Sequence, residues 1–165
     1  WFGNSRHASL AARQYAIDNA SRIKGLGRNS WGMSASISPS TGYSGHYGSH
    51  PIGHGHKLLE DGTVAPYGAL SFLPFTPEAS MAALEHMYTI PGLVGKYGLY
   101  DAYSYATKAQ GDQPWIAKSY LGIDKGLVLL MFENYSTQLI WKLLHRNAHI
   151  RKGLSILQFE HQPNG

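Results

Sequence analysis

The stretch from residue 24 to residue 56 places the strongest constraint on the fold of this chain. It is rich in glycine, serine, histidine and tyrosine, and its few apolar residues follow no regular period. We expect such a stretch to be a long loop that leaves no room for a core. Structureless segments of this length inside a compact domain are uncommon and are often functional. The core should therefore come from helices elsewhere in the chain.

Helical patterns lie on both sides of this loop. Residues 5–17 are rich in alanine and carry apolar residues seven positions apart, which is typical of a helix. The segment Thr76-Pro77-Glu78 predicts a helix start, because threonine caps helices, proline suits the first helical position and glutamate suits the positive first turn. We predict an all-α fold with little sheet, with further helices over 76–88, 123–132, 136–145 and 147–157.

Composition excludes several classes of protein. The chain has 165 residues, of which 43% are apolar and 15% charged, as in one globular domain with a real core. Its net charge of +4 is scattered, so a nucleic-acid partner is disfavoured. The chain has no cysteine, which excludes disulfides, thiolate metal sites and cysteine nucleophiles and fits an exported bacterial protein, periplasmic or extracellular. The longest apolar run, residues 126–132, is too short to span a membrane.

The hexapeptide Tyr97-Gly98-Leu99-Tyr100-Asp101-Ala102 carries the clearest chemical signal. Asp101 follows a glycine-loosened turn and is surrounded in sequence by Tyr97, Tyr100, Tyr103 and Tyr105. Aromatic rings stack on sugar faces, phenol and carboxylate oxygens bond hydroxyls, and a carboxylate can act as acid, base or nucleophile at an acetal carbon. The alternative is a surface aspartate in a tyrosine-rich loop, and the hexapeptide alone leaves both interpretations open.

Six segments resemble, in the same order, a known bacterial family. They are Phe2-Gly3-Asn4-Ser5, residues 29–36, Asp61-Gly62-Thr63-Val64-Ala65-Pro66, residues 71–78, the hexapeptide 97–102, and residues 120–126 with Glu133-Asn134-Tyr135. The chain resembles, over residues 2–159, the glucoamylase-like family that includes endo-β-1,2-glucanases, with the glycosidase-like domains of cyclic β-1,2-glucan synthases as distant relatives. The resemblance implies an (α/α)6 toroid whose cleft is formed by loops at one end.

A complete toroid of twelve helices of about 11–12 residues does not fit in this length. We therefore expect residues 1–165 to be a single partial catalytic domain, the C-terminal half of a toroid with long aromatic active-site loops. Such a half should expose a large apolar face, which the missing N-terminal half of the same domain would cover.

The resemblance implies a glycoside hydrolase acting on β-glucan, by endo-hydrolysis of β-1,2-glucan with two carboxyl groups. The family pattern has an acidic residue at Asp101, our first choice. Asp124 also matches a family position, but Lys125 replaces a usual glutamine, and Asp124 could instead pair with Lys125 or begin a helix. Glu133 is a further catalytic candidate, with hydrogen bonding to loop backbone as the alternative. Asp61 is a further fallback candidate, but it opens an Asp-Gly turn and we expect it to cap that turn instead.

The second acid is missing where the family has one. In the glucanases the segment matching residues 31–37 ends near an acidic residue, and the synthase relatives have a glutamate near Ala35, whereas Ala35 and Ile37 here carry no carboxylate. Either the second acid lies outside this chain, or this chain is a non-catalytic carbohydrate-binding relative that has lost one catalytic acid. Both hypotheses imply an oligosaccharide or polysaccharide partner.

The candidate substrate-binding residues are mostly aromatic. Their roles are stacking on sugar rings or hydrogen bonding to sugar hydroxyls, and core packing is the alternative for each aromatic ring. The set consists of Trp31, Tyr67, Tyr97, Tyr100, Trp115 and His54. His46, His50, His54 and His56 also raise a third hypothesis, a metal-binding module, but their spacing matches no closed zinc pattern. We therefore expect no metal and no cofactor.

Overall fold

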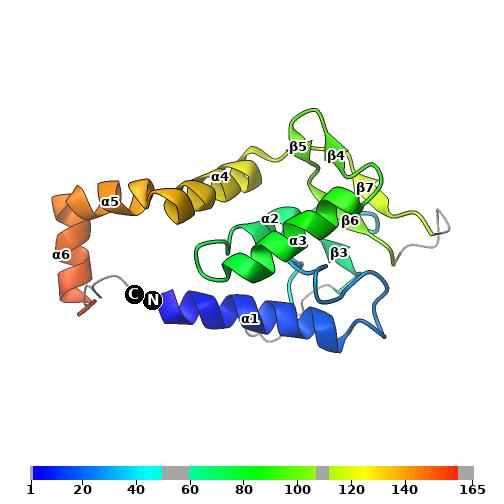
Figure 1. The fold of residues 1–165 in the computed structure, drawn as a ribbon, viewed down its shortest axis with the longest axis horizontal. Helices are drawn as coiled ribbons and strands as arrows, with labels where there is room; N and C mark the ends of the chain where they lie inside the picture. The colour runs from blue at the N-terminus through cyan, green and yellow to red at the C-terminus, as the bar shows by residue number, and fades with distance from the viewer. Residues whose placement is uncertain (1, 50–59, 107–111, 160–165) are drawn as a thin grey trace.

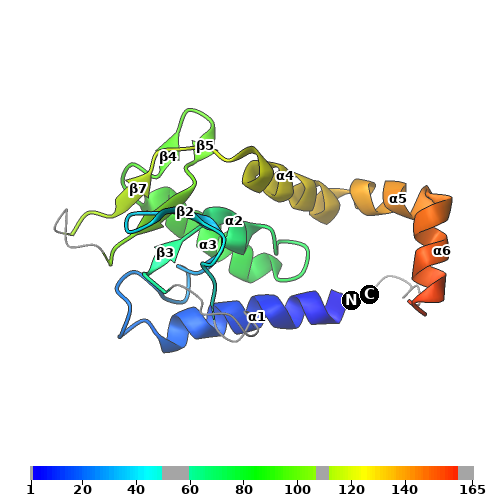
Figure 2. The same ribbon diagram turned by 180° about the vertical axis from the view of Figure 1, so that it is seen from behind.

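The computed structural model describes residues 2–49, 60–106 and 112–159. Helix predominates over strand in these ranges, which confirms the mainly helical fold expected from the sequence. The helices are α1 (Phe2–Asp18), α2 (Pro66–Leu70), α3 (Pro77–Thr89), α4 (Gly122–Ser136), α5 (Leu139–Arg146) and α6 (Ala148–Ile156). Figures 1 and 2 show a body built around α1, α2 and α3, from which α4, α5 and α6 lead away as an arm. None of these helices is long and apolar enough to cross a membrane.

In the described residues, three small antiparallel sheets connect the loops of the body. The strands are β1 (Ser36–Ser38), β2 (Gly42–Ser44), β3 (Thr63–Val64), β4 (Val94–Gly95), β5 (Gly98–Leu99), β6 (Ala102–Ser104) and β7 (Trp115–Ala117). β1 pairs with β2, β4 pairs with β5, and β6 lies between β3 and β7. The tyrosine-rich hexapeptide therefore runs along β5 and into β6, which places Asp101 at the junction of two sheets.

The expectation that residues 24–56 contribute nothing to the core is wrong for the part that the structure describes. Leu26, Trp31 and Met33 are all buried in the main hydrophobic cluster, and Trp31 has no exposed surface. The same stretch forms the β1–β2 hairpin, with Ile37 opposite Tyr43. The three buried side chains anchor the loop to the body although the segment has no periodicity.

Two glycines set the distance between this loop and α2. Gly32 has φ +110°, a left-handed conformation that glycine adopts at little cost. A Cβ built on Gly68 would lie 2.4 Å from the carbonyl oxygen of Gly32. Because neither residue has a side chain, the two backbones pack directly against each other. This contact holds α2 beside the segment that leads from Trp31 to Ile37.

The start of α3 is where the sequence predicts it, but the predicted cap is not formed. The side chain of Thr76 makes no capping hydrogen bond to the helix. Its hydroxyl instead lies 2.7 Å from the hydroxyl of Ser9, and both residues are buried. The threonine therefore joins α1 to α3, and Pro77 remains the local signal that begins the helix.

The arm carries the exposed apolar face expected from the sequence. Its contact with the body includes the rings of Phe75 and Trp141, whose centroids are 6.0 Å apart. Large apolar side chains of the arm lie open to solvent, among them Leu129, Leu143, Leu144, Ile156 and Leu157. Helices α5 and α6 have no buried residue. Such a number of exposed large apolar side chains on three consecutive helices is typical of a surface that another structure covers.

Candidate active site

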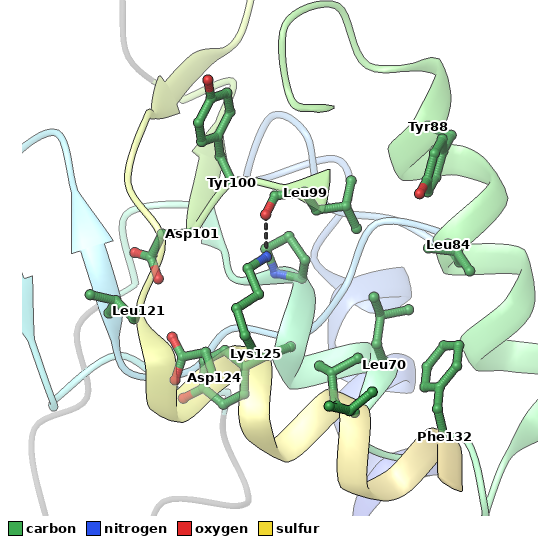
Figure 3. A pocket seen from close by; sticks show the side chains of 14 residues that line it. Leu70, Leu84, Tyr88, Leu99, Tyr100, Asp101, Leu121, Asp124, Lys125 and Phe132 are labelled. Atoms are coloured by element: carbon green, nitrogen blue, oxygen red, sulfur yellow. Dashed lines mark hydrogen bonds between the residues drawn. The ribbon is translucent and has the colours of Figure 1, made fainter. Parts of the chain in front are cut away.

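A pocket of about 320 Å³ lies between α2, α3, α4 and the end of β5. Figure 3 shows that its two ends differ in character. One end is apolar and holds the side chains of Leu70, Leu84 and Phe132. Asp101 and Asp124 lie together at the other end. The pocket therefore combines an apolar wall with a pair of carboxyl groups.

Asp101 is held firmly at its backbone and at one carboxyl oxygen. Only 4% of the residue is exposed. Its backbone N–H donates to the carbonyl of Ser119 at 3.0 Å, and its Oδ2 accepts a hydrogen bond from the backbone N–H of Ile37 at 2.8 Å. Its Oδ1 is buried and has no hydrogen-bond partner. A buried carboxylate oxygen without a partner is costly, and the neighbouring Asp124 carboxyl, which hydrogen-bonds Asp101 when it is protonated, can satisfy it.

Asp124 lies in the first turn of α4 and faces the same end of the pocket. Burial, followed by the neighbouring Asp101 carboxyl, raises the pKa of Asp124 to about 6. Its Oδ2 is also buried without a hydrogen-bond partner. Near pH 6 this carboxyl therefore holds its proton for much of the time, as a general acid requires. The structure brings together two of the three predicted catalytic carboxyls.

Lys125 approaches the pair from the next position of α4. Its Nζ donates a hydrogen bond to the carbonyl oxygen of Leu99, and it lies 5.6 Å from the centroid of the Tyr120 ring. Within the described ranges no ion pair joins Lys125 to Asp101 or Asp124, so the pairing of Asp124 with Lys125 considered from the sequence is not formed. The other alternative for Asp124, a place in the first turn of a helix, is what the structure shows.

Two predicted sugar-binding tyrosines line the pocket. Tyr67 comes from α2, and its hydroxyl lies 2.7 Å from the hydroxyl of Ser34. Burial raises the pKa of Tyr67, and the charges of Asp124 and Asp101 raise it further against the opposing hydrogen bond from Ser34. Tyr100 packs on Tyr120 with ring centroids 4.9 Å apart. Both phenols remain protonated at neutral pH and can donate to sugar oxygens.

The other predicted aromatic residues do not line this pocket. Trp31 is fully buried and stacks on Phe72, with ring centroids 6.5 Å apart. Trp115 is half-buried in β7. Tyr97 is 68% exposed and meets the Tyr120 ring edge-on at 5.4 Å. Core packing is therefore the role that the structure shows for Trp31, while Tyr97 lies on the surface beside the pocket.

The remaining candidates lie elsewhere or outside the described residues. Glu133 is near the end of α4, where its carboxylate accepts a hydrogen bond from the Thr137 hydroxyl, and it does not line the pocket. Asp61 accepts from the backbone N–H of Thr63 at 3.0 Å, so its predicted role in the turn is confirmed. His54 lies outside the described residues, together with His50 and His56. Among residues 2–49, 60–106 and 112–159, no cluster of three metal-ligating side chains occurs.

Sequence reasoning missed the apolar wall and the place of Lys125 in the pocket. Helical spacing could have revealed part of this, because the pocket-facing residues of α4 recur every three or four positions: Leu121, Asp124, Lys125, Val128, Leu129 and Phe132. The contributions of Leu70, Leu84 and Tyr88 have no such signal, since they depend on how α2 and α3 pack.

Comparisons with known proteins agree with this fold. The Glycoamylase family model, described as "Putative glucoamylase", matches residues 1–148. An exo β-1,2-glucooligosaccharide sophorohydrolase (non-reducing end) of Parabacteroides distasonis is 32% identical over 161 residues, which are 96% of this chain and 20% of that protein.

Solved structures give the same result. An endo-β-1,2-glucanase of Chitinophaga pinensis, in complex with sophorotriose and glucose, has 36% identity and a TM-score of 0.75 and covers 93% of this chain. A β-1,2-glucanase of Parabacteroides distasonis has 31% identity and a TM-score of 0.77 over the same share. The present chain spans 34% of the first structure and 20% of the second.

Proposed function

This chain belongs to the glycoamylase family, and we propose from that membership that it forms part of a glycoside hydrolase that cleaves β-glucan. The relatives reported above are named for β-1,2-linked substrates, so we extend the proposal to endo-hydrolysis of β-1,2-glucan. The observation that carries it is the pair Asp101 and Asp124, which lie together and share a hydrogen bond at one end of a pocket.

Asp124 suits the role of the acid in this reaction. Hydrolysis of a glycosidic bond needs one group to protonate the departing oxygen and another to support attack at the anomeric carbon. Asp124, whose pKa is raised to about 6, would donate its proton to the departing oxygen. Asp101, which hydrogen-bonds Asp124, would hold that carboxyl in place. A second carboxylate about 6.5–9.5 Å away, from outside this chain, would take the proton of the attacking water as its oxygen bonds to the anomeric carbon. Water then returns a proton to Asp124 and takes up the proton of the second carboxyl, which restores the site.

The surroundings of the pair also suit a sugar. The Tyr67 hydroxyl and the carboxyl groups of Asp101 and Asp124 offer both donors and acceptors within one pocket. Tyr100, backed by Tyr120, presents an aromatic ring that can lie against a sugar face. These groups would fix the orientation of the glycosidic bond relative to Asp101 and Asp124.

The segment around Ile37 supports the non-catalytic alternative. The backbone of Ile37 bonds directly to Asp101, so the segment where the family carries an acid lies beside this pair. Neither Ala35 nor Ile37 supplies a carboxylate there. A sugar-binding protein that has lost one acid would bind the same ligand without cleaving it.

Turnover separates the two functions. The full-length protein that carries this chain would be incubated with β-1,2-glucan and with its oligosaccharides, and the products would be separated by chromatography. Asp101→Asn and Asp124→Asn should each lower turnover by at least about 10²-fold, the usual scale for loss of a positioned acid or base. Asp112→Asn is the matched control, because the Asp112 side chain is fully exposed and does not line the pocket.

Binding is measured on the same samples by calorimetry. Affinity should survive better than rate in both pocket variants, since the substitution nearly keeps the side-chain shape. Undiminished turnover in Asp101→Asn would remove this residue from the mechanism. Oligosaccharide binding without turnover in the unmodified protein would instead establish the non-catalytic alternative.

The arm would be completed by other parts of the family's domain. Its exposed leucines need a covering surface, and the solved relatives extend well beyond the region that this chain matches. Helices supplied by the remainder of such a domain would bury that face and close the pocket on its apolar side.

A further inference from the structure

We propose that Lys125 is a positioning residue that limits protonation of the Asp101–Asp124 pair and fixes the strand end that carries Asp101. The proposal rests on the hydrolase function given above. It concerns a position at which the resemblance described above implies a glutamine.

The contacts of Lys125 tie α4 to β5. Lys125 follows Asp124 directly in α4, and its Nζ donates to the carbonyl of Leu99, the last residue of β5. Asp101 comes two residues after Leu99. A single side chain therefore links the helix that carries one carboxyl to the strand that leads to the other. Figure 3 shows the lysine standing between the carboxyl pair and the apolar wall.

The charges explain why a cation is useful there. Two ionised carboxylates in a half-buried pocket repel each other and lose solvation, so one of them keeps a proton. With one carboxylate ionised and Lys125 protonated, the three groups carry no net charge. Burial lowers the pKa of Lys125, while Asp101 and Asp124 oppose that shift and help to hold its proton. In return, Lys125 opposes the burial and the Asp101 charge that raise the pKa of Asp124.

No other charged side chain in the described lining offers this balance. Lys125 is the one cation among the pocket residues that the structure describes. The remaining titratable groups near it in the described residues are phenols. They are Tyr67 from α2, Tyr88 from α3, Tyr100 after β5 and Tyr120 before α4. The protonation of the pair therefore depends on the lysine more than on any of these neighbours.

The test separates charge from contact. Lys125→Gln introduces the residue that the resemblance implies and keeps a hydrogen-bond donor without the charge, Lys125→Met removes both, and Lys125→Arg keeps the charge. Lys118→Gln is the control, because Lys118 is exposed and lies outside the pocket. The titration of the aspartate carboxyl carbons is followed by NMR in the full-length protein, with the pH dependence of kcat/KM recorded in parallel.

Loss of the cation should raise the titration midpoint of Asp124 by about one pH unit in Lys125→Gln and Lys125→Met, the scale of one nearby charge. The pH optimum of kcat/KM should move in the alkaline direction by a similar amount. Lys125→Arg and Lys118→Gln should leave both quantities in place. Circular dichroism of each variant verifies that the fold is retained.

The outcomes are distinct. A midpoint that stays in place in both Lys125→Gln and Lys125→Met would overturn the electrostatic role, whatever the rates do. A fall in rate with an unchanged pH profile would likewise reduce Lys125 to a structural contact and refute the proposal. The NMR titration needs no substrate, so a protein that shows the shift but cleaves no glucan would refute the proposed hydrolysis while supporting the role of Lys125 in the pair.

Discussion

Replacing Gly68 with alanine should destabilise the protein, although alanine is the better helix former. Gly68 lies within α2, and a Cβ there would meet the backbone of Gly32 at 2.4 Å from its oxygen, 2.9 Å from its carbonyl carbon and 3.1 Å from its Cα. All three atoms belong to the main chain, which cannot swing aside as a flexible side chain can. The clash must therefore push α2 away from the segment that leads to Ile37.

The magnitude follows from two opposing effects. Alanine is favoured over glycine inside a helix by about 0.5–1 kcal/mol. Inserting a methyl group into a close-packed contact costs about 1–3 kcal/mol and occasionally more. Because contact at 2.4 Å with backbone atoms falls at the severe end, we expect a net loss of about 2 kcal/mol in the free energy of unfolding.

Gly126→Ala is the matched control. Gly126 also lies inside a helix, α4, and no atom lies within 4 Å of the position that its Cβ would take. The same substitution should therefore stabilise the protein by up to about 1 kcal/mol. Urea denaturation followed by circular dichroism compares both variants with the parent protein.

A lower free energy of unfolding in Gly68→Ala together with a higher one in Gly126→Ala would identify the Gly32–Gly68 contact. The Gly68 variant should also lose affinity for oligosaccharide, because α2 carries Tyr67 and the displaced segment carries the N–H that bonds Asp101. A Gly68→Ala protein as stable as its parent would show that the two backbones are not in direct contact, and the positioning argument for this wall of the pocket would fail.

Three further outcomes are expected. Trp31→Ala should cost about 3–5 kcal/mol in unfolding free energy, since Trp31 is fully buried, whereas Tyr97→Ala at an exposed site should change it by less than about 0.5 kcal/mol in the same denaturation assay. The pKa of Asp124 is raised to about 6, so the folded protein binds this proton more tightly than the unfolded chain. The resulting stability is complete at low pH and is lost as pH rises through about 6. Asp124→Asn should flatten this dependence of the unfolding free energy on pH, measured by denaturation between about pH 4 and pH 7. Burial raises the pKa of Asp61, but hydrogen bonds from Thr63, Ser40 and Tyr47 outweigh burial and leave the pKa lowered. Asp61 therefore contributes stability at pH values above its ordinary pKa, and this contribution disappears on acidification. The acid-dependent part of the unfolding free energy should be absent in Asp61→Ala.

Local signals predicted the elements of this structure better than their contacts. Pro77 and the apolar period that follows it place α3 within one residue of its observed bounds, even though the Thr76 hydroxyl bonds Ser9 instead of the helix. Helix propensity and periodicity act over a few residues and can be read directly. The burial of Trp31 could not be read in this way, because it depends on a glycine contact between segments far apart in the sequence.

The candidate site shows the same division. Asp101 was identified from its own neighbours, the tyrosines and the turn before it. Its closeness to Asp124 depends on α4 packing against α2 and on the strand end after Leu99, which no local pattern encodes. The sequence therefore predicted Asp101 and Asp124 as two separate candidates. The raised pKa of Asp124 follows only from the pocket that they share.

The contact between Ile37 and Asp101 explains why Asp101 keeps its position without an acid at Ala35 or Ile37. Oδ2 of Asp101 accepts from the backbone N–H of Ile37, and a backbone donor serves any side chain at that position. The loss of a carboxylate at Ala35 or Ile37 therefore leaves the placement of Asp101 intact. A carboxylate at either position, which the resemblance implies for the glucanases and the synthases, would add a third negative charge near the pair and increase the repulsion there. In this chain Lys125 is the neighbouring cation, so the pH dependence of the pair should change when that charge is removed.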